Sequence, residues 1–253
     1  MNYKMILQYD GTRYNGWQKQ GNTEHTIQGK LEALLARLTG QPVEVQGSGR
    51  TDAGVHAKGQ AAHFHLKKPW EPERLMEEIN RYLPEDIGVL ELAAAPERFH
   101  SRLNAVGKIY RYQVWMKGKA DVFSHRFFYS LGKDLDRDAM EQAAALLVGE
   151  HDFRSFCGNK NMKKSTVRRI DAIRIRPVWG GKALEMDFEG NGFLQQMVRI
   201  MAGTLIEAGL GEREPGSIGE ILQAKNRQAA GFTAPAQGLC LLQVMYKERD
   251  LKV

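Results

Sequence analysis

The sequence predicts an α/β (α+β) protein built from two similar subdomains with antiparallel sheets. Short alternating strands and amphipathic helices follow one another in the order β-α-β-β-α-β, and the second half repeats this order loosely. With 42% hydrophobic residues, a chain of 253 residues can bury a sizeable core. The segment 95–107 separates the halves, so we expect an N-terminal subdomain at 1–104 and a C-terminal subdomain at 105–253.

In the first half, each expected element has its own local signal. Apolar and polar side chains alternate in the strands, apolar residues recur at helical spacing from 26 to 38, Gly40 closes that helix, and Pro72 opens the second. The expected elements are strands at 3–9, 43–46, 60–66 and 88–93, with helices at 26–38 and 72–83. Their order is that of a ferredoxin-like (split βαβ) layer.

The second half adds elements to the same order. We expect strands at 108–116, 127–131, 167–178, 183–188 and 238–246, with helices at 136–148, 193–208 and 217–224. Two open sheets of this kind would each expose an edge, which is a site for unwanted pairing. We therefore expect the two sheets to join into one extended sheet.

Composition narrows the class of protein. The net charge of +6 favours a polyanionic partner. The two cysteines, Cys157 and Cys240, form neither a disulfide framework nor a CxxC metal pattern, which favours a reducing cytoplasm. No apolar run approaches the ~20 residues needed to cross a membrane, and the N-terminus lacks the features of a signal peptide. We expect a soluble, cytoplasmic protein without a membrane partner.

The most distinctive stretch is GSGRTDAGVHA (47–57), a glycine-rich connection between two predicted strands. Glycine adopts positive φ without steric cost, so the backbone of such a loop can approach a ligand closely. Arg50 and Asp52 lie two residues apart, and an arginine beside an aspartate keeps the carboxylate ionised. Asp52 is therefore a candidate nucleophile or base, and an ordinary salt bridge within the loop explains the same spacing.

Weaker candidates lie elsewhere. The hydrophilic stretch NKNMKKSTVRR (159–169) is either a solvated surface or a contact for phosphates. Its cations are Lys160, Lys163, Lys164, Arg168 and Arg169. Tyr14, Trp17 and His56, in or beside loops, either contact a ligand or pack in the interior. A metal site of His63, His65, His56 and Asp52 rests on weak H-x-H spacing, which exposed histidines on an alternating strand explain better.

Three stretches of the sequence together resemble the tRNA pseudouridine synthases of the A type. They are GRTDAGVHA around Asp52, KIYRY with Tyr110, and GNGFLQQMVRIMAGTL with Arg199. The resemblance extends to SFC at 155–157 and TAPAQGLCLLQV near the C-terminus, so it covers essentially the whole chain. At Gln195 and Gln196 the chain departs from related sequences, some of which carry histidine there.

The resemblance implies the pseudouridine synthase fold and an isomerase that needs no cofactor. Such enzymes break the N-glycosidic bond of uridine, rotate the base and rejoin it to the ribose through C5. Asp52 would attack either C6 of the uracil or C1′ of the ribose. Tyr110 would stack on the extruded base and could remove the C5 proton, and Arg199 would pair with Asp52. The chain shows neither a P-loop nor a GxGxxG fingerprint.

The resemblance also implies uridines 38, 39 and 40 of the tRNA anticodon arm as targets, and a homodimer as the active form. The residues expected to bind the substrate are Tyr110, Arg50, His56, Lys160, Lys163, Lys164 and Arg168. Two alternatives remain: a non-catalytic RNA-binding module, and a metal-dependent hydrolase using Asp52 and the histidines. The RNA-binding module predicts an RNP1 motif, and KIYRYQV is only a faint echo of one.

Overall fold

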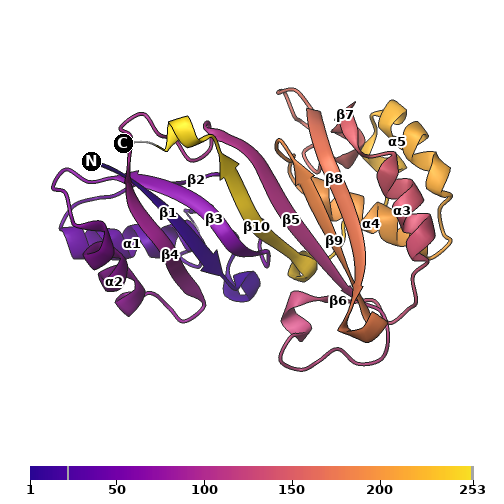
Figure 1. Cartoon of the computed structure of the whole chain (residues 1–253), viewed down its shortest axis with the longest axis horizontal. Helices are drawn as coiled ribbons and strands as arrows, with labels where there is room; N and C mark the ends of the chain where they lie inside the picture. Colours follow the sequence, from indigo (N-terminus) through magenta and orange to yellow (C-terminus); the bar gives the residue numbers. More distant parts are fainter. Residues whose placement is uncertain (22, 252–253) are drawn as a thin grey trace. The chain divides into compact units, whose positions relative to one another are not determined.

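Strands and helices alternate through the whole of the computed structural model, which describes residues 1–21 and 23–251 (Figure 1). They divide into two units. Unit 1 comprises Met1–Gly107 and the chain from Leu241 onward, and unit 2 comprises Lys108–Cys240. The last strand, β10 (Leu239–Tyr246), lies next to a strand of unit 1, whereas the sequence analysis assigned residues 105–253 to one subdomain. None of the helices in the described residues is long and apolar enough to span a membrane.

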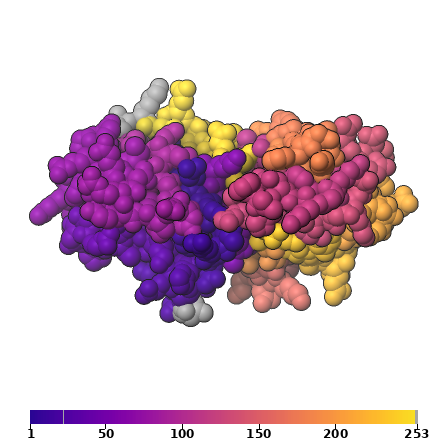
Figure 2. All heavy atoms as spheres, turned by 90° about the horizontal axis from the view of Figure 1, so that it is seen from below, coloured from indigo at the N-terminus to yellow at the C-terminus, as the bar shows by residue number. Residues whose placement is uncertain are grey.

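Unit 1 has the predicted element order. β1 (Asn2–Tyr9) pairs antiparallel with both β3 (His56–His65) and β4 (Ile87–Ala95), and β2 (Val45–Gly47) pairs with β3. The start of the chain (indigo) therefore lies side by side with later segments of the same unit (purple) in Figure 2. The predicted α/β class is confirmed for this unit.

The two helices of unit 1 begin and end where their capping residues place them. Before α1 (Ile27–Thr39), the side chain of Thr26 accepts a hydrogen bond from the Gly29 N–H at 3.2 Å, and Gly40 ends the helix with φ of 67°. Glu71 caps α2 (Pro72–Tyr82) in the same way. A side chain at the N-cap satisfies a helical N–H, and glycine at the C-cap adopts the left-handed conformation without strain.

The strands of unit 2 belong to the same ten-stranded sheet as those of unit 1, and three helices accompany them. β5 (Ala105–Trp115) pairs with β9 (Ala183–Gly190), β9 with β8 (Val167–Val178), and β8 with β7 (Gly149–Asp152). The short β6 (Tyr129–Ser130) pairs parallel with β5. The helices are α3 (Arg137–Ala145), α4 (Met197–Gly209) and α5 (Ile218–Ala224).

Helix α4 is the central helix of unit 2, and it starts later than predicted. Its residues are buried on nearly every side, as a helix that is apolar all round requires. The sequence predicts a start at 193, but Gln196 has φ of 59°, in the left-handed region. A residue in this conformation cannot continue a right-handed helix, so residues 193–196 lie outside the helix, with a turn at 195–196.

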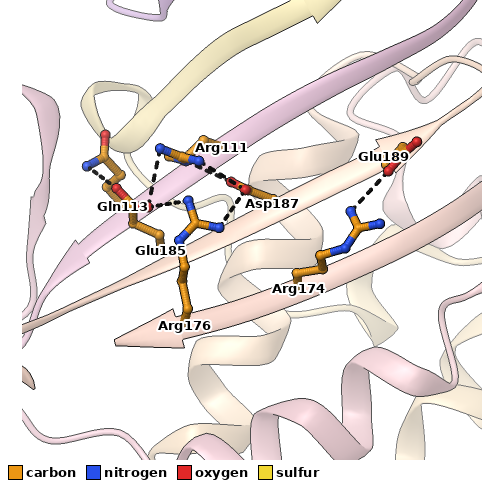
Figure 3. A network of polar contacts seen from close by, with 7 residues as sticks. All are labelled: Arg111, Gln113, Arg174, Arg176, Glu185, Asp187 and Glu189. Carbon is orange, nitrogen blue, oxygen red and sulfur yellow. Dashed lines mark hydrogen bonds and ion pairs between the residues drawn. The ribbon is translucent and has the colours of Figure 1, made fainter. Parts of the chain in front are cut away.

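One face of the unit 2 sheet carries a network of ion pairs (Figure 3). Arg111 of β5 donates two hydrogen bonds to Asp187 of β9, at 2.7 and 3.0 Å, and Arg176 of β8 bonds both Asp187 and Glu185 at 2.8 and 2.6 Å. Burial alone would raise the pKa of Asp187, but the hydrogen bonds from both arginines outweigh it and lower that pKa.

Candidate active site

Asp52 lies on the loop between β2 and β3, and the chain around it is held at several points. Asp52 itself is half-buried, and its carbonyl oxygen accepts a hydrogen bond from the Val55 N–H at 3.2 Å. At the start of the loop, the Ser48 hydroxyl donates to Oε1 of Gln60 at 2.8 Å, and the Ser48 N–H donates to the Ala61 carbonyl at 2.7 Å. The loop is therefore anchored to β3 close to the candidate nucleophile.

The segment 10–17, which follows β1, is hydrogen-bonded to the same loop, and we call this segment the brace. The Trp17 N–H donates to the Thr51 carbonyl at 3.1 Å, and the Gly54 N–H donates to the Tyr14 carbonyl at 3.3 Å. Thr51, one residue before Asp52, and Gly54, two residues after it, therefore both have backbone partners in this segment. Tyr14 and Trp17 are themselves buried, so the packing interpretation of these two aromatics is the one that the structure supports.

Two glycines allow the brace to approach the loop closely. A Cβ on Gly11 would lie 2.0 Å from the Val55 carbonyl oxygen, and one on Gly16 would lie 2.6 Å from the Thr51 carbonyl oxygen. Gly16 also has φ of 88°, in the left-handed region that side chains rarely adopt. Any larger residue at these positions must displace the backbone next to Asp52.

His56 and Arg50, both expected to bind substrate, occupy different environments. His56 is buried, and its Nδ1 accepts a hydrogen bond from the Gly11 N–H at 3.0 Å and lies 3.2 Å from a carboxylate oxygen of Asp10. Its visible contacts are thus with the brace. Arg50 is exposed, and its Nε donates to Oε1 of Gln18 at 3.0 Å.

Unit 2 supplies the other two candidates, Tyr110 and Arg199. Tyr110 lies on β5, is 7% exposed, and its ring meets that of Phe193 edge-on at 5.2 Å. Arg199 lies in the first turn of α4, where its Nε donates to the Ala234 carbonyl at 2.7 Å. The Ala234 N–H donates in return to the Arg199 carbonyl at 3.1 Å, so both ends of this residue are fixed.

The segment 230–235 that holds Arg199 is itself held by a residue that sequence reasoning missed. Arg227 donates to the Gly231 carbonyl and to the Thr233 hydroxyl, each at 2.9 Å. The Tyr112 hydroxyl donates to the Pro235 carbonyl at 2.8 Å. Burial lowers the pKa of Arg227. A single arginine in a loop gives no sequence signal, although the neighbouring TAPAQGL string marked this segment.

Residues 158–165 lie just before β8, and we call them the basic loop. Lys160, Lys163 and Lys164 are exposed, as a contact for phosphates requires. Arg168 instead turns back on its own backbone, donating to the carbonyls of Ser165 and Val167 at 3.0 and 2.6 Å, and burial lowers its pKa. The Gly158 N–H donates to the Gln195 carbonyl at 2.9 Å, which connects the loop to the turn before α4.

The histidines of β3 do not gather into a metal site. His63 is buried rather than exposed as predicted, and its Nδ1 lies 3.0 Å from the Ser101 hydroxyl. Burial and the neighbouring His100 and His65 lower the pKa of His63 to about 4. Within the parts of the chain that the structure describes, no group of three potential metal ligands lies close enough together to hold an ion.

Comparison with known proteins identifies a family model and several relatives that match this chain. The family model described as tRNA pseudouridine synthase matches residues 5–104 and 143–247. The tRNA pseudouridine synthase A of Bacillus sp. (strain KSM-64) is 48% identical over 240 residues, covering 95% of this chain and 97% of the relative. Those of Syntrophotalea carbinolica and Brevibacillus brevis are each 43% identical, over 98% and 96% of this chain and 97% and 98% of the relatives.

A crystal structure of a Cbf5-Nop10-Gar1 complex also matches, with a TM-score of 0.40 and 12% identity, over 96% of this chain and 50% of that chain. The three relatives, matched over nearly their full length, define an enzyme of the isomerase class. The chain belongs to the tRNA pseudouridine synthase family. Neither of the alternative functions, an RNA-binding module or a metal-dependent hydrolase, agrees with this membership.

Proposed function

We propose that this enzyme converts uridines 38, 39 and 40 in the anticodon arm of tRNA to pseudouridine. The observation that carries the proposal is the family membership over both halves of the chain, together with the braced loop that presents Asp52. The net charge of +6 and the exposed lysines of the basic loop suit a polyanionic substrate.

In the proposed reaction, Asp52 is the nucleophile and attacks either C6 of the uracil or C1′ of the ribose. The C1′–N1 bond breaks, the base turns, and C5 bonds to C1′. The bond that Asp52 formed then breaks, either as C5 displaces the carboxylate from C1′ or as the carboxylate is eliminated from C6, and N1 gains a proton. Tyr110 stacks on the base, and its phenolic oxygen takes the proton that C5 must lose. Arg199 is the proposed ion-pair partner of Asp52.

Of the other residues expected to bind tRNA, Arg50 and three lysines contribute through charge, and His56 and Arg168 act inside the protein. Arg50 and the lysines at 160, 163 and 164 contact phosphates, which fix the register of the substrate without reading its sequence. His56 acts from inside the protein, by fixing the brace against the loop of Asp52. Arg168 has a similar internal role at the base of the basic loop.

We further propose that the enzyme acts as a homodimer in the cytoplasm. One feature supports the compartment: Cys157 and Cys240 are both buried thiols rather than halves of a disulfide. Such cysteines are typical of proteins from a reducing environment. Size-exclusion chromatography with light scattering would measure the mass in solution, and a mass of one chain would contradict the dimer.

The test of the function is to incubate the purified protein with unmodified tRNA and to locate pseudouridine at each position. Pseudouridine at 38, 39 and 40 is expected without added cofactor. Modification confined to other positions would leave the family assignment intact and contradict these targets. A chelator should not change the rate, and inhibition that added metal reverses would favour the hydrolase.

Asp52→Asn tests the nucleophile, since it keeps the side-chain shape but removes the negative charge and the attacking oxygen. No turnover is expected, with tRNA binding largely preserved because phosphate contacts supply most of the affinity. Pseudouridine mapping and a binding titration measure the two effects separately. Substantial product from this variant would exclude Asp52 as the nucleophile.

A further inference from the structure

Trp179, at the turn between β8 and β9, has an unusual backbone conformation. Its φ is 53°, and Gly180 and Gly181 continue with φ of 61° and 80°. For a large aromatic residue, positive φ is a genuine outlier, whereas glycine would adopt it without strain. Backbone strain of this kind persists where the surrounding structure enforces it, and it gathers at functional positions.

The ring of Trp179 is held in place and yet remains exposed. It packs against Trp115 and Phe128, with ring centroids 5.6 and 6.4 Å apart, and both of those residues are buried. Trp179 itself is 51% exposed. Packing of the ring against its neighbours therefore does not fully explain the strained backbone, because about half of the Trp179 surface remains exposed to water.

The segment that packs beside Trp179 is basic, and Asp136 and Asp138 line a hollow with Gly181 of the same turn. The segment 117–134 packs onto the same aromatic cluster through Ala120, Phe127 and Phe128. Together with residue 182, this segment has a net charge of +3, from five basic and two acidic residues: Lys117, Lys119, Arg126, Lys133, Lys182, Asp121 and Asp134. Asp134 pairs with Lys117 at 3.1 Å, and Asp121 accepts the N–H groups of Phe123 and Ser124.

We propose that Trp179 is a stacking platform for an unpaired base of bound RNA, and that its basic neighbours contact the adjacent phosphates. A preformed aromatic ring beside cations is the arrangement by which proteins bind unpaired nucleotides without reading their sequence. A protein partner is disfavoured because the excess of cations suits a polyanion. The identity of the RNA as tRNA rests on the proposed function.

This platform is separate from the basic loop. Trp179 follows the last residue of β8, and the loop at 158–165 precedes the first, so the strand places them about 37 Å apart at 3.4 Å per residue. Substitutions at two sites this far apart should have additive effects on binding. A substrate that contacts both must therefore extend along the length of β8.

The test compares Trp179→Gly and Trp179→Phe with wild type in binding of an unmodified tRNA transcript. Glycine removes the ring and relieves the strain of positive φ, so the variant is expected to fold; its melting temperature checks this. Stacking of one base is worth about 1–3 kcal/mol, so Trp179→Gly should raise Kd by about 5- to 150-fold. Trp179→Phe should bind within about threefold of wild type.

The outcomes separate this proposal from the proposed function. If wild type modifies tRNA while Trp179→Gly binds it with unchanged Kd, the platform is wrong and the function stands. If wild type neither binds nor modifies tRNA, both fail. A loss of binding in Trp179→Gly that accompanies a change in oligomeric mass would assign the ring to a protein interface and overturn the platform. Loss of binding at constant mass, adding to the effect of the lysine variants, supports it.

Discussion

At the scale of single residues, the hydroxyl of Tyr110 separates stacking from proton transfer. Stacking needs only the ring, whereas removal of the C5 proton needs the phenolic oxygen. Tyr110→Phe should therefore bind tRNA normally and release product at a greatly reduced rate. The measurement is the single-turnover rate alongside Kd.

Tyr110→Phe can be checked against a substrate and a second variant. With 5-fluorouridine at the target position there is no C5 proton, and the variant should rearrange it about as fast as wild type. Tyr246→Phe is the control, since the Tyr246 hydroxyl donates to the Ser101 carbonyl at 2.6 Å, away from the contacts of the candidate catalytic residues. It should lower stability and retain turnover. Near-normal turnover of ordinary tRNA by Tyr110→Phe would exclude the base role.

At the scale of elements, the brace at 10–17 makes the position of Asp52 depend on Gly16, a residue that is distant from Asp52 in sequence. Gly16→Ala places a Cβ near the Thr51 carbonyl and strains a backbone at φ of 88°, so the loop around Asp52 must move. A displacement of about 1 Å at a reacting group costs on the order of 10²-fold in rate. We expect that loss in kcat, with tRNA affinity much less affected.

The matched control for Gly16→Ala is Gly21→Ala in the same loop, where an added Cβ meets no atom of the described residues within 4 Å beyond its chain neighbours. Circular dichroism shows whether each variant is folded. If the folded Gly16→Ala variant keeps the wild-type kcat, the brace does not position the nucleophile.

The basic loop is a second element with a measurable role. Changing Lys160, Lys163 and Lys164 together to Ala should weaken tRNA binding and reduce its salt dependence. The slope of log K against log salt should fall by about 0.7–0.9 for each phosphate that the variant no longer neutralises. Turnover at saturating tRNA should change little. Lys67, Lys68 and Arg74, exposed basic residues outside this loop, give a comparison that also removes three charges. An unchanged slope in the triple lysine variant would mean that the loop is only solvated.

At the scale of the molecule, the ion-pair network of unit 2 links stability to pH. The pKa of Asp187 is lowered in the folded state, so its contribution is present above the unfolded pKa of about 3.9 and is lost as pH falls through the folded value. The stability difference between wild type and Asp187→Asn should therefore be large at neutral pH and should shrink in acid. Thermal melts at several pH values measure it.

The control for this pH dependence is Asp134→Asn, at an exposed carboxylate paired with Lys117, where only a small effect is expected. A difference for Asp187→Asn that stays constant from neutral pH into acid would contradict the linkage.

Much of the fold was predictable because local signals agree with the final structure. The caps at Thr26 and Gly40 and the alternation in β8 placed those elements within a residue or so. β7 was missed because GEHD is short and carries no apolar alternation. The late start of α4 could not be predicted, because glutamine has no preference for the left-handed conformation that tertiary contacts impose on Gln196.

The candidate site was predictable only in part. Asp52, Tyr110 and Arg199 carried a recognisable sequence signal, and the family assignment that follows from the same stretches is confirmed. Their individual roles stay predictions. The supports of the site were invisible, because the Gly11, Gly16 and Arg227 contacts join segments that are distant in sequence or lack any periodic pattern.

The return of β10 to the first unit has a consequence for synthesis. A ribosome releases the N-terminal strands early, yet the partner strand beside β3 lies at residues 239–246. Domains often fold as they emerge, and an unpaired strand edge in a waiting intermediate invites aggregation. For this chain the first unit cannot complete its sheet until β10 has left the exit tunnel. Its nascent form therefore carries an open edge while all of unit 2 is being made, a period in which chaperone protection matters most.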